Sequence, residues 1–132
     1  MTTFYEKEGV VKASANVASG TMTVQWDSLL DDKAIEECCE AQIEQVKKGI
    51  KVLLLDVATA NGVPSQKRQD WFESHLFPNF SSLGLKASIT ILPKSALTKL
   101  ASKKWVKNAG TFKFDSFEAG SLSDAQELAR QL

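Results

Sequence analysis

The feature that most constrains the fold is a continuous apolar run, KVLLLDVA, at positions 51–58. The run is short, is bounded by turn-forming residues, and does not alternate between apolar and polar residues. Such a run is typical of a strand that is covered on both faces, as in the interior of a parallel sheet. We therefore expect residues 51–58 to form a central strand of the sheet.

The segments on either side of this run predict the other elements. Residues 1–26 contain strand-forming stretches separated by glycines, which predicts a β-meander of two or three strands that ends at Trp26. Further strands are expected at 86–93 (KASITILP) and 111–114 (TFKF).

Helices are expected where apolar residues recur three and four positions apart. Four segments have this pattern. They are residues 31–49 (DDKAIEECCEAQIEQVKKG), residues about 66–80, residues about 95–107, and the last residues of the chain. The 66–80 helix is expected to bend or stop near Pro78, because proline has no amide hydrogen to donate. Ser123 and Gln126 fit a capping box for the last helix.

Together these elements predict one α/β domain over residues 1–132. Strands that alternate with helices favour right-handed crossovers and a largely parallel sheet, to which the meander adds antiparallel strands. We expect a mixed β-sheet of about five to six strands packed with about four helices, in the order βββαβαβαβα. The hydrophobic content of 43% is that of an ordinary globular protein with one core.

The cysteine and histidine content excludes several classes of site. The two cysteines, Cys38 and Cys39, are adjacent on a predicted helix, and the chain has one histidine. This arrangement suits neither a structural disulfide nor a zinc site, so we expect no metal and no cofactor. No stretch approaches the roughly 18 continuous apolar residues of a membrane span, and the first residues lack a signal-peptide pattern. We expect a cytoplasmic protein.

Charge is divided unevenly along the chain although the net charge is zero. Residues 1–63 carry ten acidic and six basic groups, whereas residues 74–114 carry seven lysines and no Asp or Glu. This polarity can steer an acidic partner, although lysine is also an ordinary solvated surface residue. Lys103, Lys104 and Lys107 surround Trp105, a pattern that nucleic-acid-binding proteins also use. Without a known reading motif, we expect no nucleic-acid binding.

The stretch NGVPSQKRQDW, residues 61–71, contains the main candidate site. Ser65 is placed to cap the helix that follows, and this local role is the simplest interpretation. Lys67 and Arg68 are less easily explained, because cations in the first turn oppose the helix dipole. Two cations and unpaired amides at the carboxyl end of a parallel strand favour an anion-binding or partner-binding site.

Three neighbouring residues complete this tentative site. Asn61 and Gly62 supply a turn that tolerates a positive φ angle. Asp56 follows three leucines near the strand end, where a carboxylate needs hydrogen bonds, and amides of the 59–65 loop are its expected donors.

The helix after this loop carries more aromatic residues than one inward-facing stripe needs. Trp71, Phe72 and His75 are therefore candidate interface residues, in a homodimer or around an apolar ligand. His75 more simply contributes packing than catalysis. Neither a carboxylate pair nor a Ser-His or Cys-His arrangement follows from the spacing, so no catalytic residue is assigned and no enzyme activity is expected.

The order of these segments resembles the STAS-like (SpoIIAA-like) family, which is related to bacterial anti-sigma-factor antagonists. The resemblance is carried by Trp26, LLLDV, SQKRQDW, LGLKASITILP and the helix after FDS. It implies a small α/β fold with a regulatory role and no enzyme activity. In the phosphorylated antagonists, a kinase-like partner phosphorylates a serine at the start of the helix after the central strand. Ser65 matches that position, whereas Pro64 replaces the aspartate of the family motif.

Two functions remain open at this point. The first is a non-enzymatic regulatory module that binds another protein, with a regulatory kinase-like protein as one possible partner. The alternative is a carrier or sensor that holds a small anionic or amphipathic, lipid-like ligand with Lys67, Arg68 and the aromatic residues. A carrier requires an enclosed apolar pocket beside the Ser65 loop. An interaction module requires a flat exposed patch and no cavity.

Overall fold

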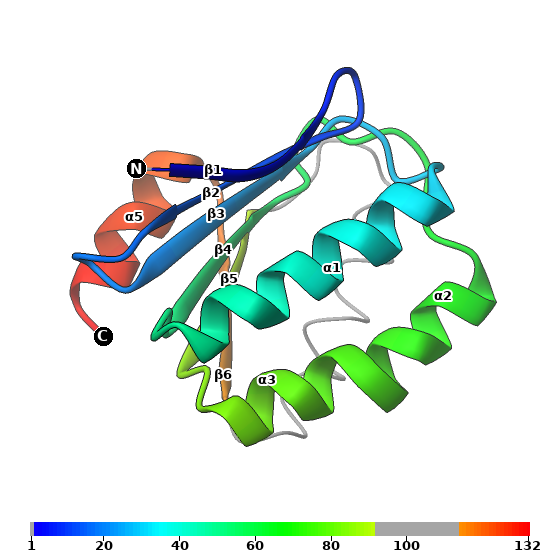
Figure 1. The fold of residues 1–132 in the computed structure, drawn as a ribbon. Coiled ribbons are helices and arrows are strands. Elements are labelled where there is room, and N and C mark those ends of the chain that lie inside the picture. Colours follow the sequence, from blue (N-terminus) through cyan, green and yellow to red (C-terminus); the bar gives the residue numbers. More distant parts are fainter. Residues whose placement is uncertain (1, 92–113) are drawn as a thin grey trace.

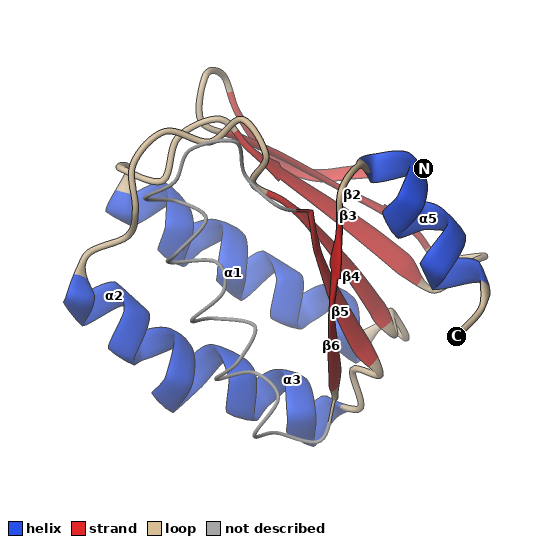
Figure 2. Ribbon diagram, turned by 180° about the vertical axis from the view of Figure 1, so that it is seen from behind, coloured by secondary structure: helices blue, strands red, loops and turns tan. Residues whose placement is uncertain are grey.

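A six-stranded sheet separates two helical layers (Figures 1 and 2). The computed structural model describes residues 2–91 and 114–132. The strands lie in the sheet in their order along the chain. They are β1 (Thr2–Lys7), β2 (Val11–Asn16), β3 (Thr21–Trp26), β4 (Val52–Asp56), β5 (Ala87–Ile91) and β6 (Asp115–Ala119).

The sheet is mixed, as the sequence predicts. β1, β2 and β3 pair antiparallel and form the expected meander. From β3 to β6 each pair is parallel, so these strands end at the same edge of the sheet. β4 lies between β3 and β5, which confirms the predicted central position of the apolar run.

Helices cover both faces of the sheet in Figures 1 and 2. α1 (Asp32–Lys47) and a second, longer helical segment lie on one face, and α5 (Leu122–Arg130) lies on the other. The longer segment consists of α2 (Gln66–Trp71), a π-helical turn (η1, Phe72–Leu76) and α3 (Phe77–Leu83). The helix expected at 95–107, with its lysine-rich stretch around Trp105, lies outside the described residues.

Side chains of β4 contribute to two apolar clusters. Leu53 belongs to the larger cluster, which α1 and the longer helical segment cover. Val52 and Leu54 belong to the smaller cluster, which also contains Ala125 of α5. Because side chains alternate between the faces of a strand, a strand that is buried on both faces has a continuous apolar sequence.

The longer helical segment continues through Pro78 instead of stopping there. Pro78 lacks the amide that would bond to the carbonyl of Ser74, and the π-helical turn immediately precedes this position. Asn79 Nδ2 donates to the carbonyl oxygen of His75 at 2.8 Å. This side chain satisfies a carbonyl near the irregular turn. The segment ends at Leu83.

The C-terminal elements differ from the predicted ones. The last described strand is Asp115–Ala119. Of the strand predicted at 111–114, residues 111–113 lie outside the described part, and Phe114 is buried just before β6. The strand forms because parallel pairing with β5 satisfies its backbone, although Asp and Glu have low strand propensity. The cap of α5 is Ser121, not Ser123, and its side chain accepts from the amide of Asp124.

Candidate functional site

The loop after β4 lies at the carboxyl edge of the parallel strands. Asp56 Oδ1 accepts from the amide of Ala58 at 3.1 Å, so its described donor lies before the 59–65 loop. The Asn61 amide donates to the Asp27 carbonyl at 3.1 Å, and the Asn61 carbonyl accepts from the Leu29 amide at 2.9 Å. These bonds join the loop to the chain that leaves β3.

Gly62 holds this loop in a conformation that other residues rarely adopt. Its φ is +75°, in the left-handed region. A Cβ atom at this position would lie 2.4 Å from Cδ2 of Leu30. Gly62 therefore has a local structural role in which both backbone angle and space matter.

Ser65 begins α2 as the sequence predicts. Its hydroxyl accepts from the Arg68 amide at 3.1 Å, and the residue is exposed. Lys67 is also exposed, and its ammonium group makes no hydrogen bond or ion pair with another described side chain. Ser65 and Lys67 thus lie near each other at an accessible helix start.

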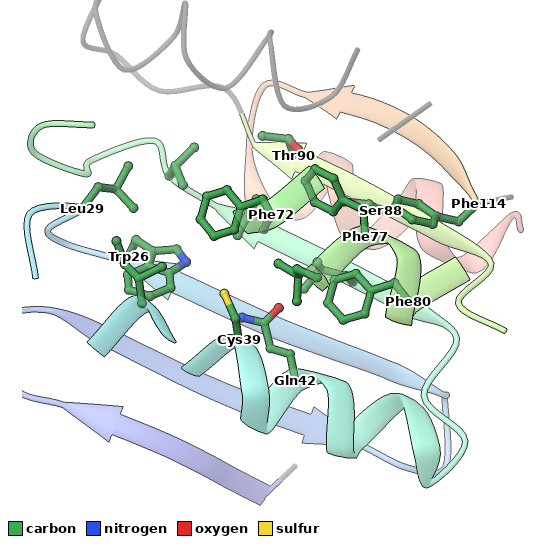
Figure 3. A pocket seen from close by; sticks show the side chains of 15 residues that line it. Trp26, Leu29, Cys39, Gln42, Phe72, Phe77, Phe80, Ser88, Thr90 and Phe114 are labelled. Carbon is green, nitrogen blue, oxygen red and sulfur yellow. The ribbon is translucent and has the colours of Figure 1, made fainter. Parts of the chain in front are cut away.

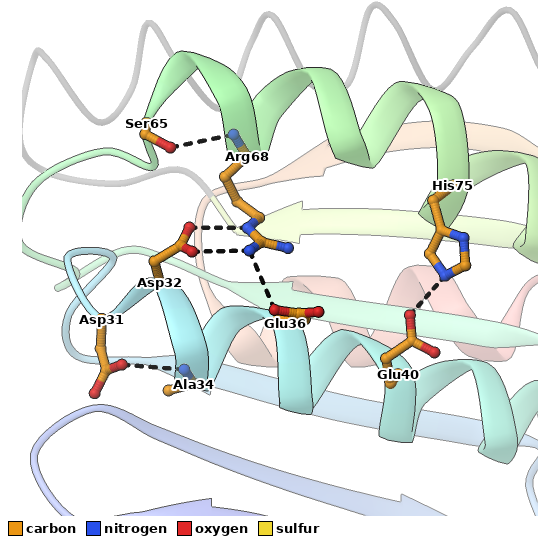
Figure 4. Close-up of polar contacts among 8 residues, drawn as sticks. All are labelled: Asp31, Asp32, Ala34, Glu36, Glu40, Ser65, Arg68 and His75. Carbon is orange, nitrogen blue, oxygen red and sulfur yellow. Dashed lines mark hydrogen bonds and ion pairs between the residues drawn. The ribbon is translucent and has the colours of Figure 1, made fainter.

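The Arg68 side chain points away from this corner towards α1 (Figure 4). Its Nε and Nη2 donate to the two carboxylate oxygens of Asp32, each at 2.8 Å, and Nη2 lies 3.4 Å from Glu36 Oε2. The guanidinium carbon lies 4.6 Å from the ring centroid of Trp71. The side chain is only 12% exposed. Arg68 is therefore engaged within the protein, and it is not an uncommitted ligand for an anion.

His75 makes another polar contact between the longer helical segment and α1. Its Nε2 lies 2.5 Å from Glu40 Oε1, and its ring stacks on Trp71 with centroids 4.9 Å apart. We call the complete set the interhelical polar row. It consists of Asp32, Glu36 and Glu40 on α1, and Arg68, Trp71 and His75 on the facing segment.

The interhelical polar row also affects proton binding. The hydrogen bond from Arg68 is the largest cause of a lowered pKa of Asp32, and the positive charge of Arg68 adds to this effect. The charged form of Asp32 is therefore favoured in the folded protein. Asp32 and Glu36 contact Arg68, and Glu40 contacts His75, so the row connects α1 to the longer helical segment.

The predicted aromatic surface is largely absent from the described residues. Phe72, a candidate interface residue, is 7% exposed and lies in the larger apolar cluster, while Trp71 is half-buried. Phe72 therefore lies in the core, and its role as an interface residue stays a prediction. The large hydrophobic residues that are exposed in the described part are Val17, Leu30 and Leu122, on three different segments. The homodimer remains a prediction.

The aromatic side chains instead surround a cavity between the helical layer and the sheet (Figure 3). The cavity has a volume of about 60 Å³. Most of its described lining is apolar, and the aromatic members are Trp26, Phe72, Phe77, Phe80 and Phe114. Phe72, Phe77 and Phe80 point inward, and not to an exposed surface, because their helical segment packs directly on the sheet.

Polar residues also line the cavity, and none of them belongs to the site predicted from the sequence. Gln42 on α1 and Thr90 on β5 are each 2% exposed, and Ser88 lies on the same strand face as Thr90. Figure 3 shows Gln42 and Thr90 pointing towards the aromatic rings. A signal for Gln42 exists, since it follows Cys38 by four positions and Ile35 by seven, on the apolar stripe of its helix.

A comparable signal exists for the strand residues. Ser88 and Thr90 alternate with Ile89 and Ile91, so the 86–93 run has a polar and an apolar face. The isoleucines belong to the cluster beside α5, which leaves the hydroxyl-bearing residues on the cavity side.

The two cysteines show no sign of activation. Burial raises the pKa of the Cys38 thiol to about 12, and burial also raises the pKa of Cys39 well above its usual value. Protonated, buried thiols are poor nucleophiles and poor metal ligands. Among the described residues, no three or more His, Cys, Asp or Glu side chains group in a way that would hold a metal ion.

Two further findings concern membrane-spanning helices and similarity to known proteins. Within the described parts, every helix falls short of the length and apolar character needed to cross a bilayer. Comparison with known proteins finds no matching family model, no matching curated protein and no matching solved structure.

Proposed function

We propose that this chain is a non-enzymatic STAS-like module that acts as a carrier or sensor of a small, mainly apolar molecule. The observation that carries the proposal is the cavity between the helical layer and the sheet. An apolar pocket is what distinguishes a carrier from a module that works through a flat surface. The inward orientation of Phe72 and its aromatic neighbours supports the same choice.

The site of the proposed ligand differs from the one expected at first. The cavity lies against η1 and α3, whereas Lys67 lies at an exposed position on α2 and Arg68 is paired with α1. The described cavity lining contains aromatic and aliphatic side chains with a few neutral polar groups. Such a lining is typical of small-molecule sites, in which apolar walls provide affinity and polar groups provide orientation.

Ligand-observed NMR with a collection of small apolar compounds tests this function. Leu55→Phe enlarges a side chain that lines the cavity, and Leu122→Phe makes the same change at an exposed position on α5. We expect compounds that bind the wild type and Leu122→Phe but not Leu55→Phe. Compounds that bind all three proteins equally, or the absence of any bound compound, would contradict the proposal.

A second candidate function is protein binding through the exposed corner. It is favoured by the accessible Ser65 hydroxyl and by Lys67, whose ammonium group has no described partner. Because the carboxyl edge of a parallel sheet is the usual ligand side of an α/β fold, a protein partner there is physically reasonable. The resemblance to anti-sigma-factor antagonists gives a phosphorylatable Ser65 as one form of this function.

A pull-down from cell extract tests the second candidate. Ser65→Asp and Lys67→Glu change the corner and leave the Arg68 pairing with α1 in place. Lys51→Glu is the matched control, because Lys51 is exposed at the opposite end of β4. We expect a partner that is lost or gained in both corner variants and unchanged in the control. Identical partners in all the proteins would exclude the corner.

A further inference from the structure

The amide of Gln42 is a polar group that the fold leaves partly unused inside the cavity. Gln42 is 2% exposed and lines the cavity, and its Nε2 lies 3.6 Å from the sulfur of Cys38. Its carbonyl oxygen, Oε1, accepts no hydrogen bond from any described residue. An amide oxygen on an apolar cavity wall has few hydrogen-bond donors around it, so a donor there is favourable. A ligand within the cavity can supply that donor.

The lining also determines the charge of a suitable ligand. Each described residue that lines the cavity is neutral. Arg68, a candidate anion ligand from the sequence, is hydrogen-bonded to Asp32 and paired with Glu36. A carboxylate placed in the cavity would lose its hydration without gaining a countercharge from the described lining, which is unfavourable. The lining therefore disfavours an anionic ligand and favours a neutral one.

The size of the cavity limits the ligand further. A volume of about 60 Å³ accommodates a short aliphatic chain more readily than a large ring system. The side chains around it, including Leu53 and Leu76, provide contacts for such a chain. Thr90 supplies a second neutral polar group on the strand side of the cavity.

We infer that the cavity binds a compact neutral amphiphile, with a short apolar body and one hydroxyl-type donor that bonds to Gln42 Oε1. This inference rests on the proposed carrier or sensor function and specifies the chemical class of its ligand. Of the anionic and amphipathic ligands that the sequence leaves open for a carrier, it selects a neutral amphiphile held by an amide.

Three probes of matched chain length test the inference on the full chain. They are 1-butanol, which is neutral with a donor; 1-chlorobutane, which is neutral without one; and butyrate, which is charged at pH 7. Dissociation constants are measured by titration followed in ¹H–¹⁵N and methyl NMR spectra. The methyl signals of Leu53 and Leu76 report whether a probe occupies the cavity.

We expect 1-butanol to bind about threefold to tenfold more tightly than 1-chlorobutane, the usual effect of one added hydrogen bond. The side-chain amide signals of Gln42 should shift with 1-butanol and not with 1-chlorobutane. Gln42→Met keeps the length of the side chain and removes the acceptor, so it should abolish or reverse the preference for 1-butanol. Butyrate should leave the Leu53 and Leu76 signals unchanged.

The possible outcomes separate this inference from the function on which it rests. Equal affinities of 1-butanol and 1-chlorobutane in the wild type would overturn the role of Gln42 and leave the carrier or sensor function intact. Tight binding of butyrate would overturn the neutral class. Binding of none of the probes and of no compound in the broader screen would overturn both. Because the wild-type comparison needs no substitution, the test does not depend on the folding of Gln42→Met.

Discussion

At the scale of single residues, Arg68 shows how a contact distant in sequence can offset an unfavourable local position. In the first turn of α2 its charge opposes the helix dipole, at a cost of about 0.3 to 1 kcal/mol for an exposed group. The planar guanidinium compensates by donating two hydrogen bonds to Asp32, which lies 36 positions earlier. An arginine that appears suited to an external anion therefore binds a carboxylate of its own chain.

This pairing predicts a pH-dependent coupling between Arg68 and Asp32. The pKa of Asp32 is lower in the folded protein than in the unfolded chain, so the stabilisation is complete above the unfolded pKa. It is lost as the pH falls through the folded pKa, because the protonated carboxyl no longer carries charge. A double-mutant cycle with Arg68→Met and Asp32→Asn, measured by urea unfolding, should give about 0.5 to 1 kcal/mol at pH 7.

The coupling should decrease as the pH is lowered from 7 towards 3. The cycle removes contributions that do not involve the pair, such as the contact of Arg68 with Trp71. A coupling that stays constant over this range would show that the ionised carboxylate of Asp32 is not its source.

Gly62→Ala should destabilise the protein more than Gly9→Ala. The two glycines have similar φ angles, +75° and +73°, so alanine suffers similar backbone strain at both, of roughly 1 to 2 kcal/mol. A Cβ at position 9 meets nothing within 4 Å, whereas one at position 62 meets the Leu30 side chain. Urea unfolding measures the difference. Adding Leu30→Ala should reduce it, and equal losses at the two glycines would contradict the steric explanation.

At the scale of elements, local capping signals show roughly where a helix begins but do not fix its first residue. Ser65 was predicted correctly as the cap of α2, because it follows a turn and a proline that holds the chain extended. At the last helix, Ser121 and Ser123 both fit a cap, and the earlier serine is the one used. Ala125 of α5 lies in the apolar cluster beside the sheet. The local sequence alone does not decide between the two serines.

The cap at Ser65 gives a prediction that separates stability from regulation. Ser65→Ala should lower the free energy of unfolding by about 1 kcal/mol, because the Arg68 amide loses its acceptor. Ser65→Asp should retain most of this stability, since aspartate also caps helices well. Ser121→Ala provides a comparison at the cap of α5. Unchanged unfolding of Ser65→Ala in urea would exclude a structural role for this hydroxyl.

At the scale of the whole molecule, the arrangement of the sheet determines how strongly each strand is protected from amide hydrogen exchange. β4 has paired neighbours on both sides and apolar clusters on both faces, whereas β1 is an edge strand of the described sheet with exposed residues. Amide hydrogen exchange should be slowest at Leu53 and Leu54 and much faster in β1. Exchange of β4 as fast as that of β1 would contradict the central role of this strand.

The sequence by itself determined the features that depend on near neighbours along the chain. The apolar run at 51–58, the meander that ends at Trp26, and the helices that follow Asp31 and Ser65 all follow from periodicity and capping. These signals arise within a few residues, so they identify the class of fold, an α/β domain with a mixed sheet. The specific STAS-like assignment and its complete helix order remain proposals.

The tertiary structure alone decided how the candidate residues are used. It directed Arg68 to α1, turned Phe72 inward, and placed Gln42 and Thr90 beside the same cavity. Local sequence patterns place side chains on a helix or strand face, but they do not state which segment that face will meet. That choice depends on sheet order and helix docking, because contacts between residues far apart in sequence form only when the layers pack.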